Sequence, residues 1–274
     1  MRVFISSDIE GVAGVVARAE TATDGFDWGR ARERMTAEVL AAIEGARAAG
    51  ASGFVVADSH GSGLNLIPER LPDDAELVRG WPRPLMMMEG IERGDFACAF
   101  LLGYHAGARW GAGGLAHSFS SRLFSGLKVA GWELPEAGLN AAIAGQYGVP
   151  VTLVSGDDAC IEEVVSLLGG IETVTSKRSL GFFAAAGRSP NAVQADIRAA
   201  AERAVRRAGE IVPWRLEGSL TVELELKTPI LAETLAYVPV FERVGATTIR
   251  FEAADAGQVS RYLQFFIQVL PSLV

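Results

Sequence analysis

The chain has 274 residues, of which 49% are hydrophobic and 21% are charged, a balance that excludes intrinsic disorder, collagen and coiled coil. With 33 acidic and 25 basic residues the net charge is −8, so the chain lacks the basic field that binds a phosphate backbone, and we expect no nucleic-acid partner. At this length, one large α/β domain and two smaller domains are equally reasonable.

The sequence shows no sign of targeting or of a membrane span. An apolar, strand-like run begins at Val3 without the basic segment and long apolar stretch of a signal peptide. Apolar runs elsewhere stop well short of the roughly 18 residues that a membrane span requires. The two cysteines, Cys98 and Cys160, lie in apolar surroundings and are expected to be buried and reduced. We therefore expect a cytoplasmic protein without a membrane partner.

The first half of the chain alternates short apolar runs with helical patterns. The apolar runs predict strands at 3–6, 53–57, 97–102 and 149–155. Helical spacing predicts helices at about 35–46 and 139–147, which end ahead of Gly50 and at Gly148. Strands separated by helices favour parallel βαβ units. The first half is therefore predicted to be an α/β domain with a parallel sheet.

The second half of the chain shows a different order of predicted helices and strands. A short helix at 161–168 is interrupted by Gly169 and Gly170, and a long amphipathic helix follows at about 192–208. Strands are predicted at 219–226 and 247–253, ahead of a closing helix at about 257–270. We place the boundary so that residues 1–165 form the parallel-sheet domain and residues 166–274 form a smaller α+β domain.

Potential metal ligands follow three of the predicted strands. Asp8 and Glu10 come directly after the first strand, and residues two apart in extended backbone project to the same side. His60 follows the second strand, and His105 follows the third. In open parallel sheets the carboxyl ends of the strands form the ligand crevice, so we expect these four side chains to converge.

An isolated histidine or an aspartate after a strand is more often structural, but the joint pattern favours a metal site. Oxygen and nitrogen ligands without cysteine suit Zn²⁺, with Mn²⁺ or Co²⁺ as possible substitutes, and a carboxylate-rich set suits two divalent ions. His117, in a glycine-rich loop, is a candidate acid/base group. Glu133 and Glu136 are both candidate acidic ligands, and composition does not choose between them. We interpret Met86, Met87 and Met88 as core residues and Asp157 and Asp158 as helix caps.

Taken together, these motifs resemble the DppA-type zinc D-aminopeptidases. The resemblance covers about the first 160 residues and rests on runs that stand here as Ser7–Gly11, Met35–Glu38, Asp58–Gly61 with Asn65, Gly103–Ala106, His117–Ser118 and Glu136–Asn140. It implies a ring-like homo-oligomer, a decamer in the described member, and it selects Glu136 because only that residue fits the family pattern Glu-x-Gly-x-Asn. It also implies a binuclear zinc centre, two ions per chain, with catalytic His117 and the ligands Asp8, Glu10, His60, His105 and Glu136.

The resulting hypothesis is a zinc-dependent aminopeptidase acting on short peptides with a free amino terminus, such as D-Ala-D-Ala. Residues 1–165 would then hold the catalytic site, and residues 166–274 would contribute to oligomerisation. The same ligand types also serve two-metal phosphoesterases and other metal-dependent amidohydrolases. Little Lys or Arg lies near the ligands to hold a phosphate, Arg109 and Arg122 being the nearest. A non-catalytic metal-binding assembly protein is the remaining alternative.

Overall fold

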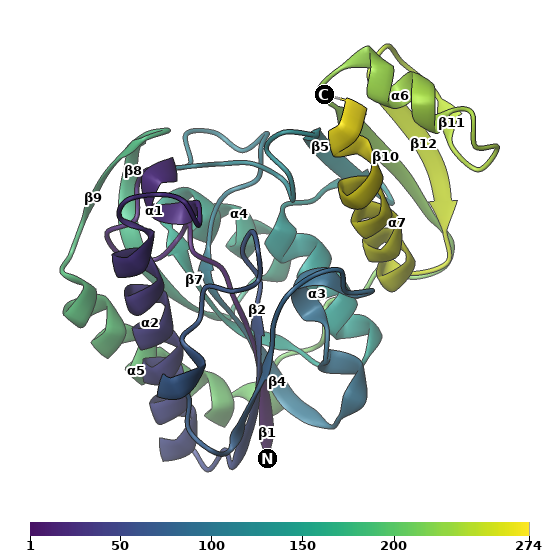
Figure 1. Ribbon diagram of the computed structural model, residues 1–274. Coiled ribbons are helices and arrows are strands. Elements are labelled where there is room, and N and C mark those ends of the chain that lie inside the picture. Colours follow the sequence, from purple (N-terminus) through teal and green to yellow (C-terminus); the bar gives the residue numbers. More distant parts are fainter. Residues whose placement is uncertain (274) are drawn as a thin grey trace.

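The computed structural model describes residues 1–273 and is built on two sheets (Figure 1). The larger has seven strands in the order β3-β2-β1-β4-β7-β8-β9, all parallel except the last pair. Its strands are β1 (Arg2–Ser7), β2 (Gly53–Asp58), β3 (Ala75–Val78), β4 (Phe96–Tyr104), β7 (Val151–Asp157), β8 (Glu172–Gly181) and β9 (Ala184–Gly187).

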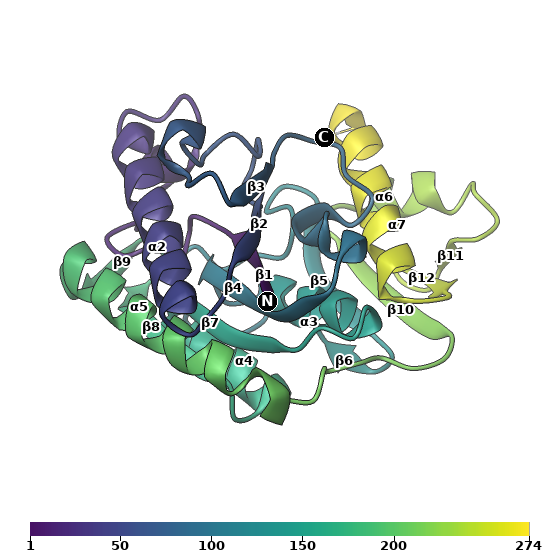
Figure 2. The ribbon, with the colours of Figure 1, turned by 90° about the horizontal axis from the view of Figure 1, so that it is seen from below.

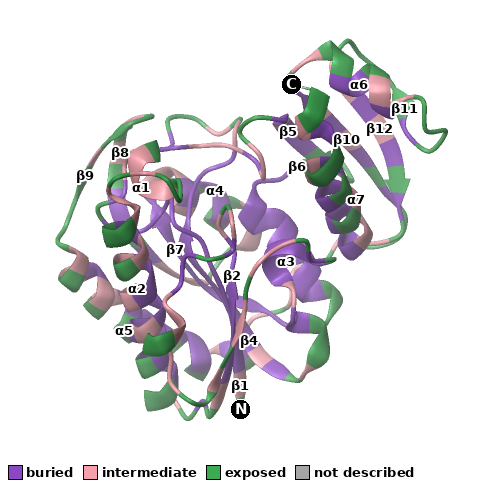
Figure 3. Cartoon of the chain, in the orientation of Figure 1, coloured by how far each residue is buried: buried purple, intermediate pink, exposed green. Residues whose placement is uncertain are grey.

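Helices cover both faces of this sheet, which explains why its central strands are apolar throughout (Figure 2). The long helices α2 (Trp28–Ala48) and α5 (Pro190–Arg206) pack on one face, against Val3 and Ile5 of β1. The other face holds α3 (Glu136–Gln146), which packs on Phe4. Figure 3 shows the strands buried between these layers while the outer sides of α2 and α5 are exposed. Helix α4 (Asp158–Leu168) follows β7.

The smaller sheet is antiparallel and lies beside the first, with strand order β11-β12-β10-β5-β6. One hydrophobic core joins the two sheets, since Phe4, Leu127 and Phe251 belong to the same buried cluster. Its elements are β5 (Phe124–Val129), β6 (Trp132–Glu133), β10 (Leu220–Leu226), α6 (Pro229–Leu235), β11 (Glu242–Arg243), β12 (Thr248–Ala253) and α7 (Ala256–Val269).

The structure confirms the predicted fold class and each predicted helix and strand, although α2 begins at Trp28, seven residues before the predicted start. The two sheets, however, do not divide at residue 165. Strands β8 and β9, from the second half, extend the parallel sheet, and β5 and β6, from the first half, complete the antiparallel one. The sheet that each strand joins is decided by hydrogen-bond partners far apart in sequence. Local hydrophobic patterns do not encode these partners.

Two smaller expectations concern the cysteines and the membrane. Cys98 and Cys160 are buried and unpaired, as expected. Across residues 1–273, none of the helices combines the length and the apolar character needed to cross a bilayer.

Candidate metal centre

The parallel register brings the ends of β1, β2 and β4 together. Ser7 of β1 pairs with Asp58 of β2 on one side and with Leu102 of β4 on the other. The Asp8 amide then donates a hydrogen bond of 2.8 Å to the Leu102 carbonyl, which carries the ladder one residue further. Asp8, His60 and His105 therefore start from neighbouring points on one sheet edge, as the sequence predicts.

Two glycines allow the chain after β1 to approach the end of β4 closely. A Cβ on Gly11 would lie 1.8 Å from the Tyr104 carbonyl oxygen, so only glycine fits there. Gly103 has a φ of +69°, and a Cβ on it would lie 2.3 Å from the Asp8 carbonyl oxygen. The segment after Asp8 is a turn, closed by a 3.1 Å bond from the Val12 amide to the Ile9 carbonyl. The predicted extended backbone at Asp8–Glu10 is therefore wrong.

Asp8 and Glu10 nevertheless face the same imidazole. Nδ1 of His60 lies 3.2 Å from Asp8 Oδ1 and 2.8 Å from Glu10 Oε2. One potential ligand atom from each of these three residues lies within 4.8 Å of the other two, and both carboxylates are buried. The side chains of Asp8, Glu10 and His60 therefore converge as the sequence predicts, although a turn and not an extended strand brings them together.

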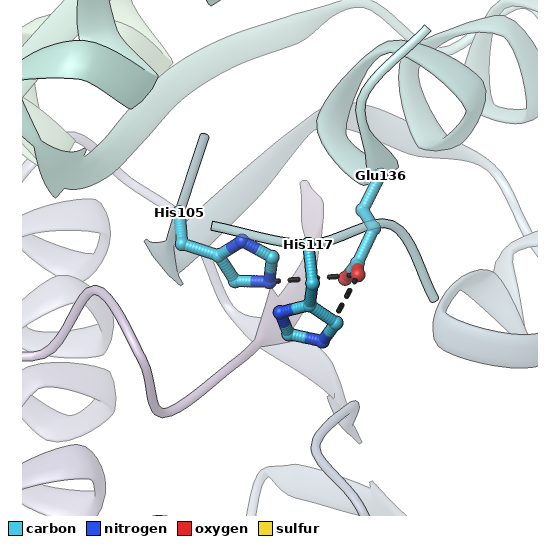
Figure 4. Close-up of side chains that lie close together, drawn as sticks. All are labelled: His105, His117 and Glu136. Atoms are coloured by element: carbon cyan, nitrogen blue, oxygen red, sulfur yellow. Dashed lines mark ion pairs between the residues drawn. The ribbon is translucent and has the colours of Figure 1, made fainter. Parts of the chain in front are cut away.

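The second group consists of His105, His117 and Glu136, whose potential ligand atoms also lie within 4.8 Å of one another (Figure 4). Glu136 Oε1 lies 3.5 Å from His105 Nε2 and 3.7 Å from His117 Nε2. The two imidazole rings stack, with centroids 4.2 Å apart and planes at 10°. Asp8 links the groups, because its Oδ2 lies 3.5 Å from His105 Nε2. Two three-residue clusters therefore share one carboxylate.

Each histidine has one ring nitrogen fixed by a backbone carbonyl. His60 Nε2 donates to the Thr21 oxygen at 2.9 Å, His105 Nδ1 to the Ala106 oxygen at 2.9 Å, and His117 Nδ1 to the Leu115 oxygen at 3.0 Å. A carbonyl oxygen only accepts, so the hydrogen of a neutral ring sits on that nitrogen. The other nitrogen of all three histidines then faces carboxylates, so a proton or a metal cation must lie between the ring and the carboxylate.

The electrostatics of the unliganded cluster reflect this crowding. Burial, together with the charge of Glu10, raises the pKa of Asp8 to about 8. Burial opposes the charged forms of His60 and His105, but the carboxylates around them outweigh it and raise both pKa values well above normal. His117 differs, because burial and the neighbouring His105 lower its pKa. The cluster thus attracts positive charge most strongly at His60 and His105.

The donor set fits a divalent metal. Glu10 Oε2 and His105 Nε2 are buried, and neither has a hydrogen-bond partner within residues 1–273. Imidazole nitrogens and carboxylate oxygens without sulfur are the ligands of catalytic zinc and of two-metal hydrolase sites. The carbonyl behind each imidazole is the outer partner that metal-binding histidines usually have.

A family model described as D-aminopeptidase matches residues 1–265. The chain belongs to the D-aminopeptidase family. A D-aminopeptidase of Bacillus subtilis (strain 168) is 30% identical over 258 residues, which cover 93% of this chain and 92% of that protein. The solved structure of the Zn-dependent D-aminopeptidase DppA from Bacillus subtilis, described as a self-compartmentalizing protease, matches with a TM-score of 0.93. That match has 28% sequence identity and covers 100% of this chain and 99% of DppA. The resemblance to the DppA-type family is confirmed.

In this member of the D-aminopeptidase family, the clusters lie in a cavity of about 790 Å³, a volume typical of small-molecule sites. Its walls include the segment around α1 (Arg18–Thr21), the loop after β2, the loop before β4, the His117 loop, the turn between β8 and β9, and helix α7. Apolar lining residues are Trp81, Met86, Met87, Leu115, Phe119, Phe182 and Ile267.

The structure separates the candidates that the sequence leaves open. Glu136 is buried in the centre, whereas Glu133 is exposed on β6 and faces Arg109. The Met86–Met88 run is buried as predicted, although Met86 and Met87 also line the cavity. Asp157 caps α4 by accepting a hydrogen bond from the Cys160 amide, as predicted. Neither Arg109 nor Arg122 lines the cavity, and Arg18 does.

One supporting group has no counterpart in the sequence predictions. The buried Lys177 on β8 donates hydrogen bonds from Nζ to the carbonyl oxygens of Glu10, Val12 and Val15. The adjacent Ser176 donates to the Gly11 carbonyl. Together they bind the backbone of residues 10–15, which we call the Glu10 loop. A single lysine within an alternating strand pattern offers no sequence signal for this role.

Proposed function

We propose that the chain is a zinc-dependent aminopeptidase that hydrolyses short peptides with a free amino terminus, D-amino-acid peptides such as D-Ala-D-Ala being the preferred class. The observation that carries this proposal is the arrangement of three lone-pair nitrogens against three buried carboxylates at one end of a cavity. Membership of the D-aminopeptidase family supports it, and the name of the relative supports zinc as the metal. A phosphoesterase is less well supported, because the lining contains one arginine and no lysine.

The site would hold two zinc ions per chain, with Mn²⁺ or Co²⁺ as substitutes. Asp8, Glu10 and His60 would hold one ion and His105 and Glu136 the other, with Asp8 facing both groups. When bound, zinc would lower the pKa of water towards neutrality and polarise the scissile carbonyl. The amino group of the peptide would be anchored at this metal-bound end of the cavity.

His117 would act as the acid/base group. Its Nδ1 is held by the Leu115 carbonyl, so its Nε2 is the atom available to accept a proton and pass it to the leaving amine. The lowered pKa keeps the ring neutral and ready to accept at neutral pH. Oxyanion stabilisation and nucleophilic attack are the alternative roles for the same atom.

Removal of metal provides the direct test of this function. Protein stripped by a chelator is expected to lose hydrolysis of D-Ala-p-nitroanilide and D-Ala-D-Ala, and to regain it with two equivalents of Zn²⁺ per chain. The matched L-aminoacyl substrates measure stereospecificity, and p-nitrophenyl phosphate measures the rival phosphoesterase activity. Peptidase activity indifferent to chelation, or phosphatase activity alone, would contradict the proposal.

We further propose that the chain assembles into a closed homo-oligomeric ring, a decamer, in which residues 166–274 contribute contacts. Exposed apolar side chains gather along α6 and on either side of β11, namely Ile230, Tyr237, Val238, Val240 and Val244. Such a group favours burial against another copy. Light scattering on the purified protein is expected to give a mass near ten chains, and Tyr237→Ser to lower it. A monomeric wild type would refute the assembly.

A further inference from the structure

The residues that line the cavity include more acidic than basic side chains. Four acidic residues line it, and three of them belong to the metal centre. Arg18 is the one lysine or arginine among the lining residues. With metal bound, the centre would take up the amino-terminal end of a short peptide, so Arg18 is the one cationic side chain on the walls for its negative carboxyl terminus.

Within residues 1–273, the guanidinium of Arg18 has neither an ion pair nor a hydrogen bond. Its acidic neighbours do not bind it: Glu20 accepts from the backbone amides of Val16 and Ala17 and pairs with Arg34 at 3.6 Å. Asp24, which also lines the cavity, forms no ion pair with Arg18. The contacts of Glu20 instead anchor the short helix α1, so that a fixed backbone presents an unpaired cation to the cavity.

Helix α1 also contacts the metal centre directly. Thr21, its last residue, accepts the hydrogen bond from His60 Nε2. Arg18 stands one turn earlier, and its carbonyl accepts from the Thr21 hydroxyl at 3.4 Å. Residues at this spacing lie about 5–6 Å apart. An extended dipeptide spans about 7 Å, and the long Arg18 side chain lines the same cavity as His60.

We propose that Arg18 binds the terminal carboxylate of the peptide substrate and thereby makes the enzyme select very short peptides with a free carboxyl end. With the amino group at the metal centre and the scissile carbonyl beside His117, the carboxylate of a dipeptide would lie further along the cavity, towards Arg18. Guanidinium binds carboxylate through two parallel hydrogen bonds, which a carboxamide cannot accept in the same way. This inference rests on the proposed peptidase function.

The test compares D-Ala-D-Ala with D-Ala-D-Ala-NH₂, which has the same scissile bond and lacks the carboxylate. Arg18→Gln is expected to raise KM for D-Ala-D-Ala about tenfold with kcat unchanged, the loss typical of one charge-assisted contact at an open site. Its kcat/KM for the amide is expected to stay within about twofold of wild type. Arg18→Lys, which keeps a point charge, is expected to lose less than Arg18→Gln does.

Arg30→Gln is the matched control, because Arg30 is exposed on α2, pairs with Asp27 and does not line the cavity. Zinc content, measured in every variant, should remain at the wild-type value. An equal loss on both substrates, or no loss on either, would overturn the role of Arg18. If the wild type hydrolyses neither substrate at full zinc occupancy, the proposed function fails instead, so the two failures are distinguishable.

Discussion

Replacing His117 with alanine is expected to lower kcat for D-Ala-D-Ala by about 10²- to 10⁴-fold, the usual contribution of a positioned acid/base group. The fold should survive, because His117 lies on a loop, its side chain is 20% exposed, and its hydrogen bond to Leu115 is local. Thermal unfolding of the zinc-free protein should therefore change little. The measurement is single-turnover and steady-state kinetics on protein of verified zinc content.

The zinc content of His117→Ala decides between catalysis and ligation. His117 Nε2 lies 3.7 Å from Glu136 Oε1, and its position within the second group would also allow it to bind a metal. An inactive variant with two zinc ions per chain supports the acid/base role, with His105→Ala as the control that loses zinc. An inactive variant with one zinc would make His117 a ligand. A fully active variant would contradict any catalytic role for His117.

The convergence of Asp8, His60 and His105 was predictable because it depends on a general property of parallel sheets. Once three apolar runs are strands of one parallel sheet, their carboxyl ends meet at one edge, whatever their separation in sequence. Local patterns also located the helices, since Gly50 and Gly148, both with positive φ, end α2 and α3 as expected. Strong local signals and a general topological rule were sufficient at these positions.

Other features depend on contacts that no local pattern encodes. Membership of β5 and β6 in the second sheet is decided by pairing between β5 and β10, about 100 positions later in the chain. The turn at Asp8–Gly11 is decided by the approach of β4, which the residues of the turn do not specify on their own. The place of Arg18 in the cavity depends on how α1 docks over His60. In each case the deciding partner is remote in sequence.

Lys177→Met is expected to lower the free energy of unfolding of the zinc-free protein by about 3 kcal/mol, because it leaves three carbonyl oxygens of the Glu10 loop without their donor. Methionine keeps the apolar stem of the side chain and so isolates the loss of the ammonium. Burial lowers the pKa of Lys177 to about 8, so most of the side chain remains protonated at pH 7. Chemical denaturation at pH 7 measures the change.

The same substitution should weaken zinc binding by about 10- to 100-fold, the effect of removing an outer group that orients a ligand. The Glu10 loop begins at a proposed ligand, and loss of its anchor lets that carboxylate leave the position opposite His60. Arg178→Met is the matched control, since Arg178 is the next residue on β8, is exposed and should affect neither property. A purely structural Lys177 would lower stability and leave zinc affinity unchanged. A fall in zinc affinity confined to one of the two ions would instead show that Lys177 positions the Glu10 ligand, as the hydrogen bonds predict.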